Sequence, residues 1–178
     1  MSMIDTKDII VQAEKFYETA KDCIGIEYNN GWYVGDKELS TEELKKYLFP
    51  KNVVTATVNL AFCCELLLKS MLNNGAKIKG HKLRPLFSTL DEKWKQLIIL
   101  KMGYENSNQI FYHLLDEISN SFEKWRYIYE CKLEDRKIQF SFLNNFSIIL
   151  MCVAHAKYFY EKKEFDKIDS KDLELILK

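Results

Sequence analysis

Apolar residues recur at helical spacing along most of this chain. Positions three or four apart predict an amphipathic helix over residues 6–23, and a nearly continuous apolar run predicts a long helix over residues 51–73. The periodicity is equally strong over residues 109–131, and another apolar stretch predicts a helix over residues 138–162. The pattern therefore predicts four long helices, separated by breaks that contain Gly, Asn and Ser.

Shorter helices are expected between and after these four. The sequence Ser40-Thr41-Glu42-Glu43 is typical of a capping box and predicts a helix that ends before Pro50. Three further helices are expected to start at Leu83 with Pro85 in the first turn, after Asp91 as a cap with Leu100 among the inward residues, and at the cap Ser170. Within residues 25–39, Asn29-Asn30-Gly31 instead indicates a turn or a small hairpin.

Composition favours one globular domain. The chain has 178 residues, of which 47% are hydrophobic and 29% charged, and it contains six glycines and two prolines. Such a chain is long enough to bury a core, and no internal repeat, low-complexity segment or linker divides it. We therefore predict an all-α fold, a single up-and-down helical bundle over residues 1–178, with four to five main helices and additional short ones.

Charge limits the partners that the chain can attract. The formal net charge is zero, so the protein has no overall electrostatic footprint for nucleic acid. Basic residues do cluster between Lys77 and Arg84, which is typical either of a solvated loop or of a local anion-binding patch. Both interpretations stay open at the level of sequence.

The cysteine content and the apolar runs indicate the cellular compartment in which the protein is expected. Five cysteines without C-x-x-C spacing are typical of reduced residues that pack in a core. No signal peptide is recognisable, and Glu65 and Lys69 interrupt the longest apolar run. A cytoplasmic protein without a membrane span is expected. No metal-ligand spacing or cofactor motif occurs, so neither a metal nor a cofactor is expected.

Two charged residues lie inside the long apolar helix. Glu65 and Lys69 are four residues apart, so they share a helix face in the order that favours an ion pair. Their neighbours one turn away are apolar, which indicates that Glu65 is at least partly buried. The pair is therefore either a core ion pair or the polar wall of a cleft.

Two cationic groups are further candidates. Arg126 lies at the edge of an apolar stripe four residues after Phe122, and we expect it to reach Glu65 or Glu130, either as a structural ion pair or within a site. His81 follows a glycine where a helix is expected to begin. With Lys82 and Arg84 it is placed either to contact phosphate or to pack in the loop.

These segments together resemble the HEPN superfamily over roughly residues 5–160. The resemblance lies in Asn59-Leu60-Ala61-Phe62 through Glu65-Leu66-Leu67-Leu68-Lys69, in Gly80-His81-Lys82-Leu83, and in Phe122 and Trp125-Arg126-Tyr127 through Glu130. It implies a four- or five-helix up-and-down bundle, usually a homodimer, associated with nucleotide and RNA binding. Such domains occur with nucleotidyltransferase antitoxins, in phage defence and as ribonucleases, so the resemblance implies RNA, a nucleotide or a cognate protein as partner.

The sequence departs from the catalytic members of that superfamily. Those members carry Arg-x4–6-His, in which the histidine resembles a general base for a ribose 2′-hydroxyl and the arginine holds phosphate. None of Arg84, Arg126 and Arg136 has a histidine at that distance downstream, and Cys131 stands five residues after Arg126. Gly-His-Lys-Leu also replaces the common Gly-His-Asp-Leu. Ribonuclease activity by the usual motif is therefore not expected.

Three functions stay open on this basis. The first is a non-catalytic, dimeric RNA-, nucleotide- or partner-binding module whose cleft is shaped by Glu65, Lys69, His81, Arg84, Arg126 and Glu130. The second is a metal-independent endoribonuclease toxin with a rearranged site, in which His81 is the base and Arg84 or Arg126 holds phosphate. The third is a structural or adaptor protein that binds a partner through exposed aromatic residues, namely Trp32, Tyr33, Tyr158 and Tyr160.

Overall fold

A computed structural model describes residues 5–24, 53–72, 80–127 and 139–177, and these ranges are helical without a β-strand. The elements are α1 Thr6–Ile24, α3 Val53–Ser70, α4 Leu83–Ser88, α5 Glu92–Lys101, α6 Asn108–Ile118, α7 Ser121–Arg126, α8 Phe140–Lys162, the 3-10 turn η4 Phe165–Lys167 and α9 Ser170–Leu177. The predicted all-α class is confirmed.

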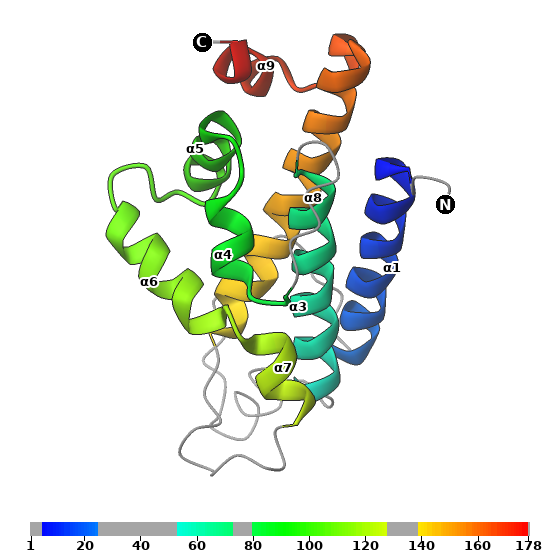
Figure 1. The fold of residues 1–178 in the computed structure, drawn as a ribbon, viewed down its shortest axis with the longest axis vertical. Coiled ribbons are helices and arrows are strands. Elements are labelled where there is room, and N and C mark those ends of the chain that lie inside the picture. The colour runs from blue at the N-terminus through cyan, green and yellow to red at the C-terminus, as the bar shows by residue number, and fades with distance from the viewer. Residues whose placement is uncertain (1–4, 25–52, 73–79, 128–138, 178) are drawn as a thin grey trace, which may run out of the picture.

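The helix α3 lies at the centre of this arrangement. It packs against α1, α4, α7 and α8, while α5 joins α8 to α9. Figure 1 shows α1 running down the view and α3 and α8 running up it, with α6 bringing the chain back down to α7. One end of the bundle therefore gathers the start of α3, the start of α8 and the short helix α7.

Apolar packing explains this central position. α3 is apolar on nearly every face and buries ten of its residues, as expected for a helix surrounded by others. It is also the one helix in the described ranges that is long and apolar enough to cross a membrane, although 56% of it is buried within the bundle. Core helices of globular proteins share these properties.

Aromatic rings fill the core between the later helices. The Phe111 ring centroid on α6 lies 5.3 Å from that of Phe87 on α4 and 5.8 Å from that of Phe142 on α8. Phe87, Phe111 and Phe146 are fully buried. Ring pairs at these distances add to the stabilisation that burial provides, so Phe111 links α4, α6 and α8 in one cluster.

The stretch predicted as continuous over residues 109–131 is two helices in the part that the structure describes. α6 ends at Ile118, and α7 begins at Ser121 after a turn at Ser119 and Asn120. The break between α6 and α7 is stabilised by two hydrogen bonds that link the start of α4 to Ser119. Its carbonyl accepts the Leu83 N–H at 3.0 Å, and its hydroxyl accepts the Arg84 N–H at 3.0 Å.

Other helix boundaries differ in smaller ways. Asp91 occupies the N-cap position of α5 as predicted, but Leu100 is 38% exposed and Ile99 points inward in its place. α9 is capped by Asp169, whose carboxylate accepts the N–H groups of Lys171 and Asp172, and Ser170 is the first helical residue. The predicted hairpin, the helix before Pro50 and the break at residues 73–75 lie outside the described residues.

Candidate functional site

The Glu65 carboxylate is buried beneath the surface of α3. Glu65 is 1% exposed, and its Oε1 accepts a hydrogen bond from Lys69 Nζ at 2.6 Å. The predicted Glu65–Lys69 pair is therefore confirmed. The same carboxylate also accepts from His81 Nδ1, at 3.0 Å to Oε1 and 2.9 Å to Oε2. Lys69 and His81 thus both bond one buried acid.

His81 links the buried Glu65 carboxylate to the molecular surface. Its side chain is 46% exposed, although its partner Glu65 is almost completely covered. Because a carboxylate only accepts, Nδ1 bears a proton, and Nε2 lies on the opposite side of the imidazole ring. Neutral Nε2 is an acceptor or a base, and protonated Nε2 is a donor.

Ser119 fixes the backbone that follows His81. Its two hydrogen bonds to the N–H groups of Leu83 and Arg84 secure the first turn of α4 against the break between α6 and α7. The same break starts α7, which carries Phe122 and Arg126. One buried serine therefore sets where both sides of the candidate site lie.

A row of aromatic rings supports His81. The His81 and Phe122 ring centroids are 5.1 Å apart, and Phe122 stacks on Phe62 of α3 at 5.1 Å. Phe62 in turn meets Phe16 of α1 edge to face at 4.6 Å. The imidazole therefore rests on a stack that joins three helices.

Arg126 meets the same ring from α7. Its guanidinium carbon lies 5.8 Å from the Phe122 centroid and 5.4 Å from the Tyr127 centroid, within the range of cation–π attraction. Because both cationic groups lie near Phe122, the His81 ring and the Arg126 guanidinium are at most about 11 Å apart. Arg126 is exposed.

The structure corrects the expected pairing of Arg126. Glu65 is bound by Lys69 and His81, and Arg126 makes no ion pair with it, so this part of the prediction is wrong. The physical reason is that Arg126 lies on the outer side of Phe122, whereas Glu65 is buried in α3. The alternative partner Glu130 lies outside the described residues, so that pairing stays a prediction.

Arg84 belongs to a different cluster. Its guanidinium carbon lies 4.0 Å from the Tyr112 ring centroid, and its Nε lies 3.4 Å from Asp116 Oδ1, both on α6. Its Nη1 is buried without a hydrogen-bond partner. Arg84 therefore holds α4 against α6, and its guanidinium is not brought together with His81 and Arg126.

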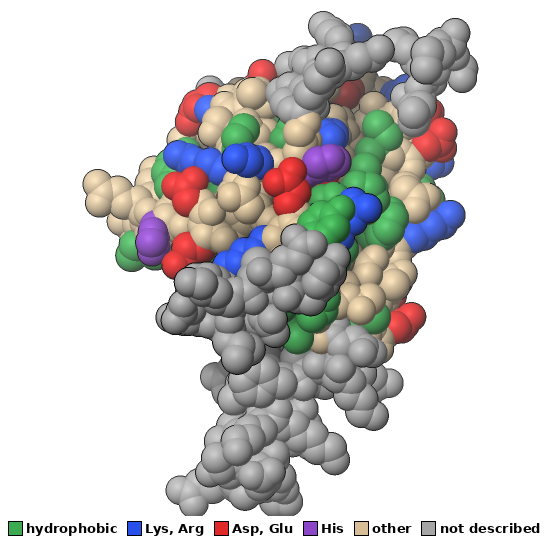
Figure 2. All heavy atoms as spheres, turned by 60° about the horizontal axis from the view of Figure 1, so that its bottom comes forward, with side chains coloured by type: hydrophobic (Ala, Val, Ile, Leu, Met, Phe, Trp, Pro, Cys, Tyr) green, Lys and Arg blue, Asp and Glu red, His purple; other side chains and the backbone are tan. Residues whose placement is uncertain are grey.

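The surface at this end of the molecule is mixed rather than uniformly basic. Figure 2 turns the lower end of the bundle toward the reader and shows a histidine side chain beside an apolar strip, with basic and acidic side chains around it. The exposed Lys82 follows His81 directly, and the exposed Glu123 follows Phe122. The site can therefore attract a small anionic group, but it does not present an extended positive field.

The other two histidines have separate partners. His155 Nε2 lies 2.7 Å from Glu14 Oε1, which joins α8 to α1, and His113 Nε2 lies 3.8 Å from Glu117 Oε1 on α6. Within the described ranges, no group of three or more His, Cys, Asp or Glu side chains could hold a metal ion.

Two buried thiols show no sign of reactivity. Burial, and to a smaller extent the Glu14 carboxylate, raise the pKa of the Cys63 thiol to about 12. Burial also raises the pKa of the neighbouring Cys64 thiol well above its ordinary value. Both therefore stay protonated, as expected for packing residues, whereas Cys152 is exposed on α8.

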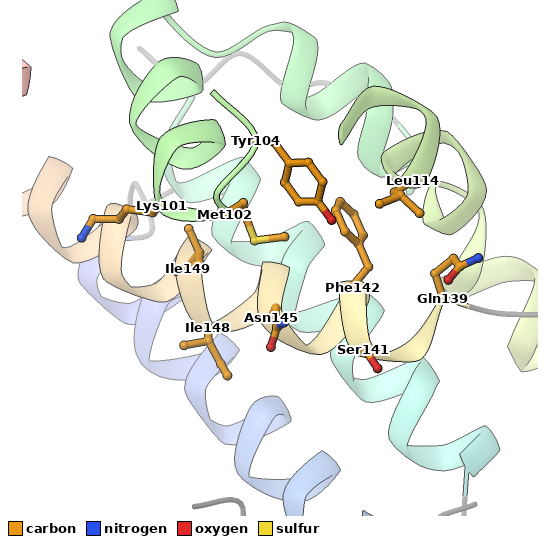
Figure 3. A pocket seen from close by; sticks show the side chains of 10 residues that line it. All are labelled: Lys101, Met102, Tyr104, Leu114, Gln139, Ser141, Phe142, Asn145, Ile148 and Ile149. Carbon is orange, nitrogen blue, oxygen red and sulfur yellow. The ribbon is translucent and has the colours of Figure 1, made fainter. Parts of the chain in front are cut away.

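A cavity of about 380 Å³ opens elsewhere, between the end of α5 and α8 (Figure 3). Its walls are mainly half-buried apolar side chains with polar groups at the rim: Lys101, Met102, Tyr104, Leu114, Gln139, Ser141, Phe142, Asn145, Ile148 and Ile149. None of the predicted site residues lines it. Lys101, its charged rim residue, is already bound to Asp172 at 2.9 Å.

The aromatic residues proposed for an adaptor surface are only partly tested. Tyr158 and Tyr160 are half-buried rather than exposed, since Tyr158 contacts Phe159 and Tyr160 packs against Trp94 and Phe165. Trp32 and Tyr33 lie outside the described residues.

Sequence reasoning missed three contributors to the site. The sequence pattern places Phe62 and Phe122 at apolar helix positions and Ser119 within one continuous helix. The sequence signals were present: Ser119-Asn120-Ser121 is a run of residues that favour helix ends, and Phe122 begins the segment that carries Arg126. Their contact with His81 depends on tertiary packing and could not be read from spacing.

Comparisons of the chain with protein-family models, with curated proteins and with solved structures found no match. The resemblance to HEPN domains therefore stays a prediction that rests on the segments quoted above.

Proposed function

We propose that this chain is an HEPN-like binding module that holds RNA or a nucleotide at the surface formed by His81, Phe122 and Arg126. The observation that carries the proposal is the arrangement of His81, which the buried Glu65 carboxylate holds through Nδ1 while the side chain stays 46% exposed beside the ring that also supports Arg126. A donor pair of this kind suits the non-bridging oxygens of a phosphate group.

Several cations of the described residues are already committed to carboxylates. Lys69, Lys95 and Lys101 each contact an acidic side chain. Arg126 instead rests on aromatic rings, which hold its guanidinium without neutralising it. Its N–H groups are therefore suited to an incoming phosphate. With a net charge of zero, we expect binding to depend on only one or two phosphate contacts and to weaken modestly with salt.

Fluorescence anisotropy with a labelled single-stranded RNA tests this proposal. The substitutions His81→Ala and Arg126→Ala should each weaken binding by about tenfold, the usual effect of losing one charge-assisted contact. His113→Ala removes an exposed histidine of α6, and Lys171→Ala removes an exposed cation of α9, at the opposite end of the molecule from α7, so both should leave affinity unchanged (Figure 1). Absence of RNA and nucleotide binding by the unmodified protein would reject the proposal.

A second function is favoured by the same histidine. A buried carboxylate behind an exposed imidazole orients Nε2 as a general base, which is what a metal-independent endoribonuclease needs. Nε2 would take the proton of a ribose 2′-hydroxyl, the 2′-oxygen would attack phosphorus, and the bond from phosphorus to the 5′-oxygen would break. That 5′-oxygen would take a proton from solvent, leaving a 2′,3′-cyclic phosphate.

Product analysis separates the two functions. An endoribonuclease should yield 2′,3′-cyclic phosphate ends that disappear in the His81→Ala variant, whereas a binding module should leave the RNA intact. The resemblance also implies a homodimer and a cognate protein such as a nucleotidyltransferase antitoxin. Sedimentation velocity tests the dimer, and a protein that sediments as a monomer at all concentrations would remove that expectation.

A further inference from the structure

We infer that Arg126 and Tyr127 form a stacking platform for an unpaired nucleobase, so that the ligand of this surface is single-stranded rather than duplex RNA. This inference rests on the proposed function and narrows the class of ligand. It starts from the position of the Arg126 guanidinium, which lies 5.8 Å from the Phe122 centroid and 5.4 Å from the Tyr127 centroid.

Contact with two rings limits the positions that the Arg126 guanidinium can take. A guanidinium held by aromatic faces offers a flat, cationic surface on which a base can stack, while its edge can still bind phosphate. The exposed face of such a group is a common recognition element for unpaired bases.

The ring of Tyr127 extends the same surface. Tyr127 is 45% exposed, whereas Trp125, two residues earlier on α7, is 5% exposed and belongs to the interior. Trp125 therefore stabilises the fold, whereas Tyr127, the residue directly after α7, faces outward. An outward-facing ring beside an arginine is the arrangement found where proteins stack bases without reading their sequence.

The distance to His81 fits one ligand that uses both parts. His81 and Arg126 both lie near Phe122, at most about 11 Å apart, so a base on Arg126 and Tyr127 can place its own or an adjacent phosphate near His81. The adjacent Glu123 is exposed, and its negative charge would repel the phosphates of a second RNA strand.

Duplex RNA does not expose the base faces that this platform would contact. In a duplex the faces of the bases are stacked inside, and binding depends on a broad basic surface that contacts backbones across a groove. The described part of this face is mixed in charge, and the chain carries no net charge. Single strands expose base faces, so they gain from the platform where a duplex does not.

Anisotropy titrations with one labelled RNA, used single-stranded and annealed to its complement, test the inference at a fixed salt concentration. Single-stranded RNA should bind at least about tenfold more tightly than the duplex. Tyr127→Leu should weaken single-strand binding by about five- to hundredfold, as loss of one stacked base does elsewhere. Tyr127→Phe keeps the ring and should bind like the unmodified protein.

Two further variants separate charge from stacking. Arg126→Lys keeps the positive charge but loses the planar group, so it should weaken single-strand binding severalfold and leave duplex binding unchanged. Phe165→Leu removes an aromatic side chain that is 41% exposed at the opposite end of α8 and should have no effect. Circular dichroism of each variant should match that of the unmodified protein.

The outcomes distinguish this inference from the function on which it rests. Equal binding of single strand and duplex, or unchanged binding by Tyr127→Leu, would overturn the platform while a loss of binding in His81→Ala still supported the module. If the unmodified protein binds neither form of RNA, the platform fails, and if it also binds no nucleotide, the proposed function fails with it.

Discussion

At the scale of single residues, a buried acid connects the core helix α3 to the molecular surface. Its one acidic residue, Glu65, is almost fully buried, yet its partners Lys69 and His81 are 30% and 46% exposed at their side chains. Burial of an ion costs free energy unless hydrogen bonds replace water, and here both carboxylate oxygens have such bonds. The arrangement is therefore stable only as a unit of three side chains.

Neutralising that carboxylate should weaken the fold measurably. Glu65→Gln keeps the volume but removes the negative charge that accepts hydrogen bonds from Lys69 and His81, and we expect the free energy of unfolding in urea to fall by about 1–3 kcal/mol. The loss stays below that of a fully buried pair because Lys69 and His81 can reach water. The control Glu117→Gln alters an exposed Glu–His pair at 3.8 Å and should change stability by less than about 0.5 kcal/mol. Equal effects would contradict the buried arrangement.

Thiol reactivity provides a second test at this scale. A raised thiol pKa keeps the neutral form at pH 8, and only the thiolate reacts, so Cys63 and Cys64 should be alkylated slowly in the folded protein. We expect iodoacetamide to modify the exposed Cys152 at least about a hundredfold faster, as measured by peptide mass spectrometry. In urea the three rates should converge. Rapid labelling of Cys63 without denaturant would show that the core is more open than described.

At the scale of elements, the break between α6 and α7 shows what sequence patterns can and cannot reveal. Ile118, Phe122 and Trp125 keep helical spacing across the turn, so periodicity predicts one helix where the chain forms two. The positions of α1, α3 and α8 were predictable because long apolar patterns fix them. The turn was not, because it depends on bonds from Ser119 to residues of α4 that lie 35 and 36 positions away.

The candidate site also combines contacts that sequence spacing predicts with contacts that depend on tertiary packing. Glu65 and Lys69 are one helical turn apart, so their pairing follows from sequence spacing. His81 reaches Glu65 across 16 positions and rests on Phe122, contacts that exist only once α4 and α7 pack on α3. The pattern predicted the Glu65–Lys69 pair but could not decide that Arg84 contacts α6 while Arg126 packs on Phe122.

Removing the Ser119 hydroxyl should therefore affect both stability and binding. Ser119→Ala leaves the Arg84 N–H without its acceptor, and we expect the free energy of unfolding to fall by about 1 kcal/mol and RNA affinity to fall severalfold. Ser88→Ala is the matched control, because that serine also bonds Arg84 but lies exposed on α4. It should cost less than about 0.5 kcal/mol in urea unfolding and leave affinity unchanged.

On the scale of the whole molecule, stability depends on one apolar core that residues of every described α-helix except α7 enter fully buried. Phe111 lies near its centre and meets rings from α4 and α8. The chain thus joins its early and late helices through contacts between residues distant in sequence. Loss of a central ring should weaken the entire bundle rather than one helix.

Adjacent residues on α6 test this expectation. Phe111→Ala should lower the free energy of unfolding by about 3–5 kcal/mol, because a fully buried ring leaves a cavity. Ile110→Ala changes a side chain that is 54% exposed and should have an effect within about 0.5 kcal/mol. Circular dichroism and intrinsic fluorescence should report one shared transition for Phe111→Ala. Separate transitions would indicate two independently folding parts.

The two charges within α3 also have a consequence for biosynthesis. As the nascent chain leaves the ribosome, the segment Val53–Ser70 has the length and apolarity of a membrane-spanning helix, and Glu65 and Lys69 are its charged residues. A charged residue at the centre of such a segment costs about 2.5–3.5 kcal/mol during insertion by the translocon, and the cost falls toward the ends, so Glu65 matters more here than Lys69, which is next to the last residue. The carboxylate that holds His81 in the folded protein therefore also disfavours recognition of α3 by the insertion machinery before α4, α7 and α8 have been made.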